Sequence, residues 1–157
     1  MNLAAQVLDL AQDHGILIAT AESCTGGMVA AALTDIPGAS AVVERGFVTY
    51  TNRAKIEMLG VSDAALDAYG AVSEEVAVEM AIGALAHSPA DVAVSITGIA
   101  GPGGSDFKPE GRVCFALADT AGVVSETVDF GALGRGPVRA AARDHALSLL
   151  LNHLRRQ

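Results

Sequence analysis

Apolar and polar positions follow two different periods along this chain, and the change of period separates helices from strands. Apolar residues recur three and four positions apart in residues 2–14, which predicts an amphipathic helix that ends at Gly15. Short apolar runs at Ile16 to Thr20 and Val92 to Thr97 are typical of strands that are buried on both faces. The same criteria predict further helices at Gly26 to Thr34, Lys55 to Leu59, Ser62 to Ala68, Ser73 to Pro89 and Pro137 to Leu154, and further strands at Val42 to Thr49, Arg112 to Ala118 and Val123 to Phe130.

The order of these elements indicates the fold class. Helices alternate with strands at first, and two strands joined across residues 120–122 then form a hairpin near the end. This order is typical of a three-layer α/β/α domain around a mixed β-sheet. Because the chain has 157 residues, no linker and no internal repeat, residues 1–157 are expected to form a single domain.

Composition excludes several classes of protein. The net charge is −8 and aromatic residues make up 4% of the chain, so neither a basic patch nor a base-stacking surface is expected, and nucleic-acid binding is disfavoured. No apolar run approaches the roughly 18 to 20 residues that a membrane helix requires. The N-terminus has no basic region before an apolar run, so no secretion signal is apparent and a cytoplasmic location is expected.

Apolar excess and cysteine usage add two expectations. A mean hydropathy of +0.40 with 18% charged residues favours a homo-oligomer, because a small monomer usually has a more polar surface. Cys24 and Cys114 lie far apart without a CxxC or Cys/His grouping, so neither a disulfide nor a metal site is expected. Cys114 is interpreted as a small buried core residue.

Two glycine-rich loops follow predicted strands, and such strand ends border the ligand crevice in open α/β sheets. The first loop reads Glu22-Ser23-Cys24-Thr25-Gly26-Gly27, and its backbone N–H groups suit an anion or a developing oxyanion. The alternative is an ordinary turn in which Ser23 or Thr25 caps the next helix. The second loop begins at Gly98 and lacks the spacing of a nucleotide-binding fingerprint.

A serine nucleophile requires a base, and the histidines do not suit this role. His14, His87, His145 and His153 all fall in predicted helices, away from the glycine loops. The chain has two lysines, Lys55 and Lys108, and a Ser–Lys pair of Ser23 with Lys55 is the available alternative. Such a lysine needs its pKa lowered by about three units. Tyr50 is placed to relay or orient the proton, unless Lys55 is simply a solvated helix residue and Tyr50 a strand-end residue.

Four ordered motifs resemble the CinA C-terminal domain family, whose best-understood members are nicotinamide mononucleotide amidohydrolases. They read A-E-S-C-T-G-G, E-R-G-F-V-T-Y-T-N-R-A-K, G-A-V-S-E-E-V and S-I-T-G-I-A-G-P-G-G, and the resemblance spans roughly Leu3 to Leu154. The resemblance implies Ser23 as nucleophile, Lys55 as general base and Tyr50 as a third site residue. It also implies deamidation of nicotinamide mononucleotide without a cofactor or a metal, in the service of NAD recycling.

The remaining site residues follow from the same resemblance. The glycine loops are expected to border the substrate, through Thr25, Gly26, Gly27, Thr97, Gly98 and Gly101. Backbone N–H groups of Thr25 to Gly27 would hold the oxyanion. Arg139 is expected to meet the phosphate, with Arg135 and Arg143 as alternatives.

Three residues of the first two motifs keep alternative roles. Glu22 either steadies the pyridinium or bonds the loop backbone, Asn52 caps a helix and shapes the site, and Cys24 is a candidate thiol nucleophile without an activating histidine. The rival functions are a non-catalytic nucleotide-binding module and a Ser–Lys amidase for another small amide.

Overall fold

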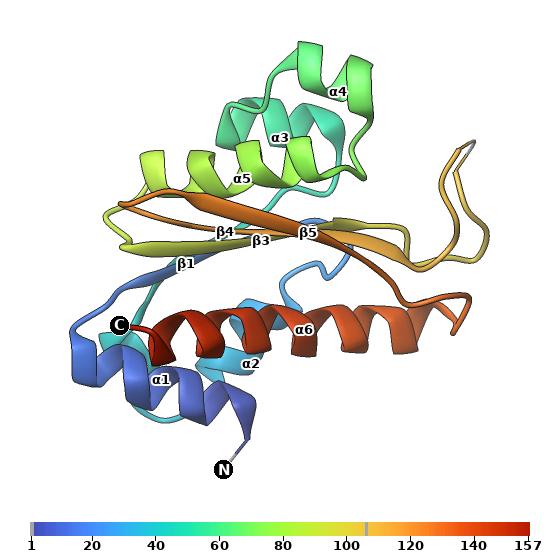
Figure 1. The fold of residues 1–157 in the computed structure, drawn as a ribbon. Coiled ribbons are helices and arrows are strands. Elements are labelled where there is room, and N and C mark those ends of the chain that lie inside the picture. Colours follow the sequence, from blue (N-terminus) through green and yellow to red (C-terminus); the bar gives the residue numbers. More distant parts are fainter. Residues whose placement is uncertain (1, 106) are drawn as a thin grey trace.

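The fold is a five-stranded mixed sheet between two layers of helices (Figure 1). The computed structural model describes residues 2–105 and 107–157; Met1 and Asp106, which the predicted domain includes, lie outside this part. The strands are β1 (Ile18–Glu22), β2 (Val43–Val48), β3 (Val92–Gly98), β4 (Arg112–Asp119) and β5 (Val123–Asp129). The helices are α1 (Leu3–His14), α2 (Met28–Thr34), η1 (Ala39–Ala41), α3 (Asn52–Leu59), α4 (Asp63–Tyr69), α5 (Glu74–Ala86) and α6 (Arg135–Arg155). The predicted three-layer α/β/α class is confirmed.

Strand order brings three loops to one edge of the sheet. The strands lie in the order β2-β1-β3-β4-β5, with β1 parallel to both β2 and β3, and with β4 and β5 antiparallel to their neighbours. The carboxyl ends of β1, β2 and β3 therefore share an edge, and the loop between β3 and β4 extends from it (Figure 1). This edge collects the segments that follow Glu22, Val48 and Gly98.

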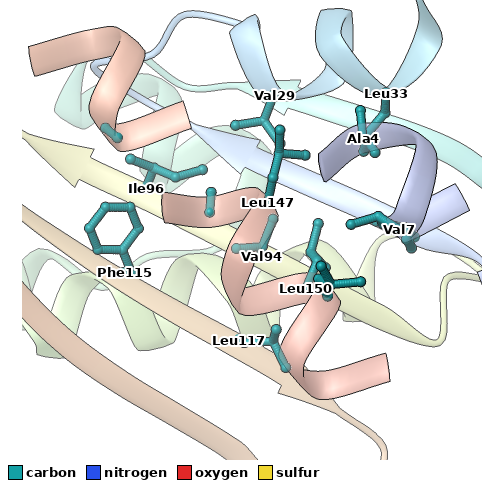
Figure 2. Packing of buried hydrophobic residues seen from close by; sticks show 14 of the residues in the cluster. Ala4, Val7, Val29, Leu33, Val94, Ile96, Phe115, Leu117, Leu147 and Leu150 are labelled. Atoms are coloured by element: carbon teal, nitrogen blue, oxygen red, sulfur yellow. The ribbon is translucent and has the colours of Figure 1, made fainter. Parts of the chain in front are cut away.

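The two faces of the sheet carry side chains of different size. On one face, the large residues of β3 and β4 pack against α1, α2 and α6, as Figure 2 shows for Val94, Ile96 and Phe115 near Leu150 of α6. The residues that alternate with these point to the other face, beneath α3, α4 and α5. The larger core cluster thus lies on the α6 side.

Small residues line the face beneath α5. Ala93, Ala116 and Ala118 are buried there, and the Ser95 hydroxyl donates a hydrogen bond of 2.6 Å to the Ala77 carbonyl of α5. Cys114 is buried in the same layer, which confirms its interpretation as a core residue. Small side chains allow the helix to approach the sheet closely, so α5 is positioned by backbone contact as well as by packing.

Several element boundaries differ from the sequence-based prediction by one to three residues, and those of β1 and α6 have identifiable causes or consequences. β1 begins and ends two residues later than predicted, because the Leu17 N–H is bound by the Asp91 carboxylate at 2.8 Å and Glu22 still pairs with both neighbouring strands. α6 begins at Arg135, two residues before Pro137, with Gly134 at its N-cap. No helix within residues 2–105 and 107–157 is both long and apolar enough to cross a membrane.

The contact between α3 and α5 depends on Gly83. A Cβ atom at this position would lie 1.9 Å from the Leu59 carbonyl oxygen at the end of α3. We expect Gly83→Ala to lower the free energy of unfolding by about 2 kcal/mol, because the strain exceeds the gain in helix propensity. Gly136→Ala in α6, where nothing lies within 4 Å, is the control and should leave stability unchanged or slightly raised. Denaturant unfolding measures both, and equal effects would contradict the proposed close contact.

Candidate active site

Ser23 lies directly after β1, at the edge where the three loops meet. Its backbone N–H donates to the Ile96 carbonyl of β3 at 2.9 Å, so the strand pairing continues to the serine itself. The chain then turns sharply, with Gly26 and Gly27 at positive φ, and enters α2. These two conformations favour glycine, because other residues rarely adopt them. The serine is thereby held in a fixed turn, not on a free loop.

The side chains of Ser23 and Lys55 meet, as the Ser–Lys hypothesis requires. Lys55 lies one turn into α3, whose N-cap is Thr51, and its Nζ lies 3.0 Å from the Ser23 Oγ. The lysine is 1% exposed, and its Nζ also donates to the backbone carbonyls of Thr49 at 2.8 Å and Tyr50 at 3.4 Å. The alternative of a solvated helix lysine is therefore wrong.

Burial changes the acidity of this lysine in the required direction. Desolvation lowers the pKa of the Lys55 ammonium from 10.5 to about 8, and the neighbouring Cys24 opposes part of the shift. A neutral amine is consequently accessible near neutral pH. The pair has the geometry and the acidity of a nucleophile with its general base.

Tyr50 contributes its backbone, while its phenol lies elsewhere. The Tyr50 carbonyl accepts hydrogen bonds from the Ser23 hydroxyl and from Lys55, both at 3.4 Å. The side chain is 55% exposed, and its hydroxyl accepts a hydrogen bond of 2.7 Å from Arg135. The predicted relay through the phenol is not what the geometry provides, because the hydroxyl binds Arg135 and the Tyr50 carbonyl is the group that binds Ser23 and Lys55.

Glu22 and Thr25 hold the first glycine loop from inside. The Glu22 carboxylate is buried and accepts hydrogen bonds from the Thr25 hydroxyl at 2.6 Å and from the Val29 and Ala30 N–H groups at 2.9 and 3.1 Å. Of the two roles considered for Glu22, the structure supports bonding of the loop. Glu22 and Thr25 do not form the cavity wall described below, because their polar atoms bind each other and α2. The start of α2 is thus occupied by a protein carboxylate.

Two arginines of α6, Arg135 and Arg139, reach the site, and each binds a different part of it. Arg139 donates to the carbonyls of Cys24 at 3.0 Å and Thr25 at 3.4 Å, so it binds the first loop from the side of α6. Arg135 lines the cavity and donates to the Gly101 carbonyl at 2.8 Å and to the Tyr50 hydroxyl. The arginine at the cavity is therefore Arg135, whereas Arg139 was expected. Arg143 pairs with Asp144 near a different hollow of the surface.

The glycines of the second loop allow neighbouring segments of the chain to approach it closely. A Cβ on Gly98 would lie 2.9 Å from the Arg112 carbonyl oxygen, and one on Gly101 would lie 2.1 Å from the Glu110 carboxylate. Thr97 is buried, and its hydroxyl donates to the Ala71 carbonyl at 2.9 Å. These contacts bring the end of β3 against the start of β4 and against the turn before α5.

These segments surround a cavity of about 330 Å³. The predicted site residues in its wall are Ser23, Tyr50, Asn52, Lys55, Thr97, Gly98 and Gly101. Glu22, Thr25, Gly26, Gly27 and Arg139 do not line it; Gly26 and Gly27 form the turn, and a Cβ on Gly26 would lie 3.3 Å from Arg139. Sequence reasoning missed the wall formed by Ala71 and Val72, although the G-A-V-S-E-E-V motif contains both. The cavity lining thus combines polar groups, among them Ser23 and Lys55, with the apolar residues Ala71 and Val72, which are called the apolar wall below.

The alternative nucleophile and the histidines do not fit this site. Cys24 lines the cavity, but burial raises the pKa of its thiol to about 11, so the thiol is protonated at neutral pH. His145 binds Glu126 and His153 binds Asp119, both away from the cavity. Among the described residues, no group of three His, Cys, Asp or Glu side chains is placed to hold a metal ion.

The fold and the site define an α/β/α domain with a buried Ser–Lys pair at the carboxyl edge of a mixed sheet. Residues 1–154 match the CinA C-terminal domain family, and the chain belongs to this family. It is 52% identical to the nicotinamide-nucleotide amidohydrolase PncC of Escherichia coli K12 over 151 residues, which is 96% of this chain and 92% of that protein.

Two crystal structures have the same fold. The competence/damage inducible protein CihA from Agrobacterium tumefaciens has a TM-score of 0.92 and 49% identity, covering 96% of this chain and 93% of that one. A CinA superfamily protein from Klebsiella pneumoniae has a TM-score of 0.94 and 35% identity, covering 99% and 97%.

The buried Glu22 carboxylate should contribute strongly to stability. Glu22→Gln preserves the volume but replaces one acceptor oxygen by an NH₂ group, which then faces a backbone N–H of α2 or the Thr25 hydroxyl. We expect the free energy of unfolding to fall by about 2 kcal/mol, because a buried donor loses its acceptor. The control, Glu57→Gln, removes an exposed pair with Arg53 and should change stability by less than about 1 kcal/mol. Denaturant unfolding at pH 7 tests the difference, and a Glu22→Gln protein as stable as the parent would contradict this role.

Proposed function

We propose that this protein hydrolyses the carboxamide of nicotinamide mononucleotide to nicotinate mononucleotide and ammonia, with Ser23 as nucleophile and Lys55 as general base. The observation that carries the proposal is the 3.0 Å contact between the Ser23 Oγ and the Lys55 Nζ, in the wall of the cavity. The name of the Escherichia coli relative, nicotinamide-nucleotide amidohydrolase, supports the substrate.

The surroundings of Lys55 support its role as a base. A neutral amine has two N–H donors and one lone pair. The carbonyls of Thr49 and Tyr50 lie at 2.8 and 3.4 Å and accept the two N–H groups. The lone pair can then face the Ser23 oxygen at 3.0 Å, and proton abstraction requires the hydroxyl proton to turn from the Tyr50 carbonyl toward this lone pair.

The reaction balances with these two side chains and one water molecule. The Ser23 oxygen attacks the amide carbon while its proton moves to Lys55, which gives a tetrahedral intermediate. Lys55 then donates that proton to the departing nitrogen, the C–N bond breaks, and ammonia leaves an acyl ester on Ser23. Water attacks the ester, Lys55 accepts a proton from the water and returns it to the Ser23 oxygen, and nicotinate mononucleotide is released.

The sequence assigns the oxyanion of the tetrahedral intermediate to backbone N–H groups of Thr25 to Gly27, whereas the structure favours an N–H group closer to Ser23. The Gly26 N–H already donates to the Ser23 carbonyl at 3.0 Å, so it is engaged in the turn. The N–H groups of Cys24 and Thr25 bind no other residue in the described part of the chain. We assign the oxyanion to the Cys24 amide, because Cys24 lines the cavity and Thr25 does not. Loss of such a donor typically costs a hundredfold or more in rate.

Arg135 suits the phosphate of the nucleotide. Its guanidinium is held at the cavity by the Gly101 carbonyl and the Tyr50 hydroxyl, and neither partner is charged. The start of α2 cannot hold the phosphate, because the Glu22 carboxylate already binds its N–H groups. The charge of Arg135 is not neutralised by its partners and is available for an anion. The nicotinate mononucleotide formed in this way is a precursor suited to NAD recycling.

Exposed apolar side chains support the expected homo-oligomer. Ile82, Val124 and Leu133 are each about half or more exposed, at 49%, 65% and 55%. They lie on α5, on β5 and before α6, so more than one face is available for contact with a second copy.

Hydrolysis of nicotinamide mononucleotide with detection of ammonia tests the function. We expect Ser23→Ala to reduce kcat by about a thousandfold or more, and Lys55→Met to do the same, because the two residues act as a unit. Ser40→Ala, an exposed serine in η1, is the matched control and should retain the parent rate. Cys24→Ser should also retain activity, because the thiol is not the nucleophile.

Three outcomes would contradict the proposal. Full activity in Ser23→Ala would exclude the covalent mechanism. Saturable nucleotide binding without ammonia release would favour a nucleotide-binding module, and turnover of other small amides alone would favour a different Ser–Lys amidase.

The pH dependence of kcat/KM should follow Lys55. The active form is the neutral amine, and the pKa of about 8 lies below the usual value, so the active fraction rises with pH. We expect kcat/KM to increase about tenfold per unit up to pH 8 and then to level off. The Cys24→Ser protein should give a rise of the same form, because the Cys24 thiol, with a pKa of about 11, does not titrate in this range. Its midpoint should be unchanged or slightly lower, because Cys24 raises the pKa of Lys55. A flat profile between pH 6 and 9 would be inconsistent with Lys55 as the base.

A further inference from the structure

The turn between α4 and α5 forms the apolar wall of the cavity through Ala71 and Val72. The turn has no regular secondary structure, yet four consecutive carbonyls, from Tyr69 at the end of α4 to Val72, accept hydrogen bonds from side chains. Those of Tyr69 and Val72 accept from the Lys108 Nζ, both at 2.5 Å. The Gly70 carbonyl accepts from the Ser73 hydroxyl at 2.8 Å, and the Ala71 carbonyl accepts from Thr97. The wall is thus held in place by side chains.

Lys108 connects two walls of the same cavity. It lies on the loop between β3 and β4, and residues 101–103 of that loop line the cavity beside Ala71 and Val72. The loop itself is braced, because Ser105 and Lys108 exchange backbone hydrogen bonds of 3.0 and 3.2 Å and the Gly103 N–H donates to Glu110 at 2.8 Å. A braced loop therefore carries the ammonium that fixes the turn. Lys108 is also the one of the two lysines that the reaction does not use.

The Ser–Lys pair is held without Lys108. Ser23 is fixed by the Ile96 carbonyl, and Lys55 is fixed by the carbonyls of Thr49 and Tyr50. Loss of the Lys108 amine consequently removes support from the apolar wall but leaves the reacting groups in place. Apolar walls of this kind hold the flat part of a ligand, while polar groups orient it.

We propose that Lys108 is a positioning residue that fixes the Ala71–Val72 wall against the pyridinium ring and so sets the affinity for the nucleotide. This inference rests on the proposed function for the identity of the substrate. Binding energy from a wall that is the same in the ground state and the transition state appears in KM and not in kcat. The expected signature is a rise in KM with little change in kcat.

The test compares Lys108→Met, which retains the side-chain stem, with Arg156→Met, which removes the same charge at the end of α6. We expect Lys108→Met to raise KM for nicotinamide mononucleotide about tenfold, with kcat within about threefold and the same midpoint in its pH profile. Arg156→Met should match the parent. Lys108→Gln, which retains a donor, is measured in parallel and should show an intermediate KM.

Calorimetric binding separates this inference from the proposed function. The dissociation constant of nicotinamide mononucleotide is measured for Ser23→Ala with and without Lys108→Met, and we expect about tenfold weaker binding in the double variant. If the double variant binds more weakly but the parent protein releases no ammonia, the role of Lys108 in positioning the wall is supported and the proposed deamidase activity is excluded. An unchanged dissociation constant and KM would overturn the role of Lys108, as would loss of fold in both Lys108 variants. Failure of Ser23→Ala to bind the nucleotide would overturn both proposals.

Discussion

The burial of the Lys55 amine beside Ser23 is the constraint on which the site depends. An ammonium removed from water is unfavourable unless its donors are bound, and here backbone carbonyls of residues 49 and 50 bind them. These carbonyls are in place because β2 runs parallel to β1 and ends opposite Glu22, just before Ser23. α3 must then begin at Asn52, so that its first turn returns Lys55 to the serine. A local hydrogen-bond requirement thus fixes the relative position of a strand, a helix and a loop.

The loop that carries Ser23 is held from two sides by groups of opposite charge. Glu22 binds the start of α2 from within the core, and Arg139 binds the carbonyls of Cys24 and Thr25 from α6. Together they bind carbonyls of the loop and N–H groups of the helix that follows it. Such a segment has few alternative conformations, which suits a site whose donors must be in position before the substrate arrives.

Sequence patterns predicted most of this architecture, because the buried strands and amphipathic helices carry clear periods. Excluding the histidines left Ser23 with Lys55 as the available pair, and the family resemblance implied their roles. The structure brings the two side chains together. The roles of Glu22 and of the two arginines were harder to predict. Which arginine reaches the cavity depends on the residue at which α6 begins, and the helix starts at Arg135 although Pro137 suggested a later start. The Ala71–Val72 wall has no chemical signature of its own, because its backbone is fixed by residues distant in sequence.

The contact of Arg139 with the first loop joins segments from opposite ends of the chain. During synthesis, Ser23 and Lys55 leave the ribosome well before α6 does. The nascent chain then has both members of the pair but lacks the guanidinium that binds the carbonyls beside the serine. The contacts of the first loop are complete only when the last helix packs against it, so a chain without α6 has Ser23 and Lys55 but lacks the Arg139 guanidinium. Packing of this last helix therefore completes the set of contacts around the first loop.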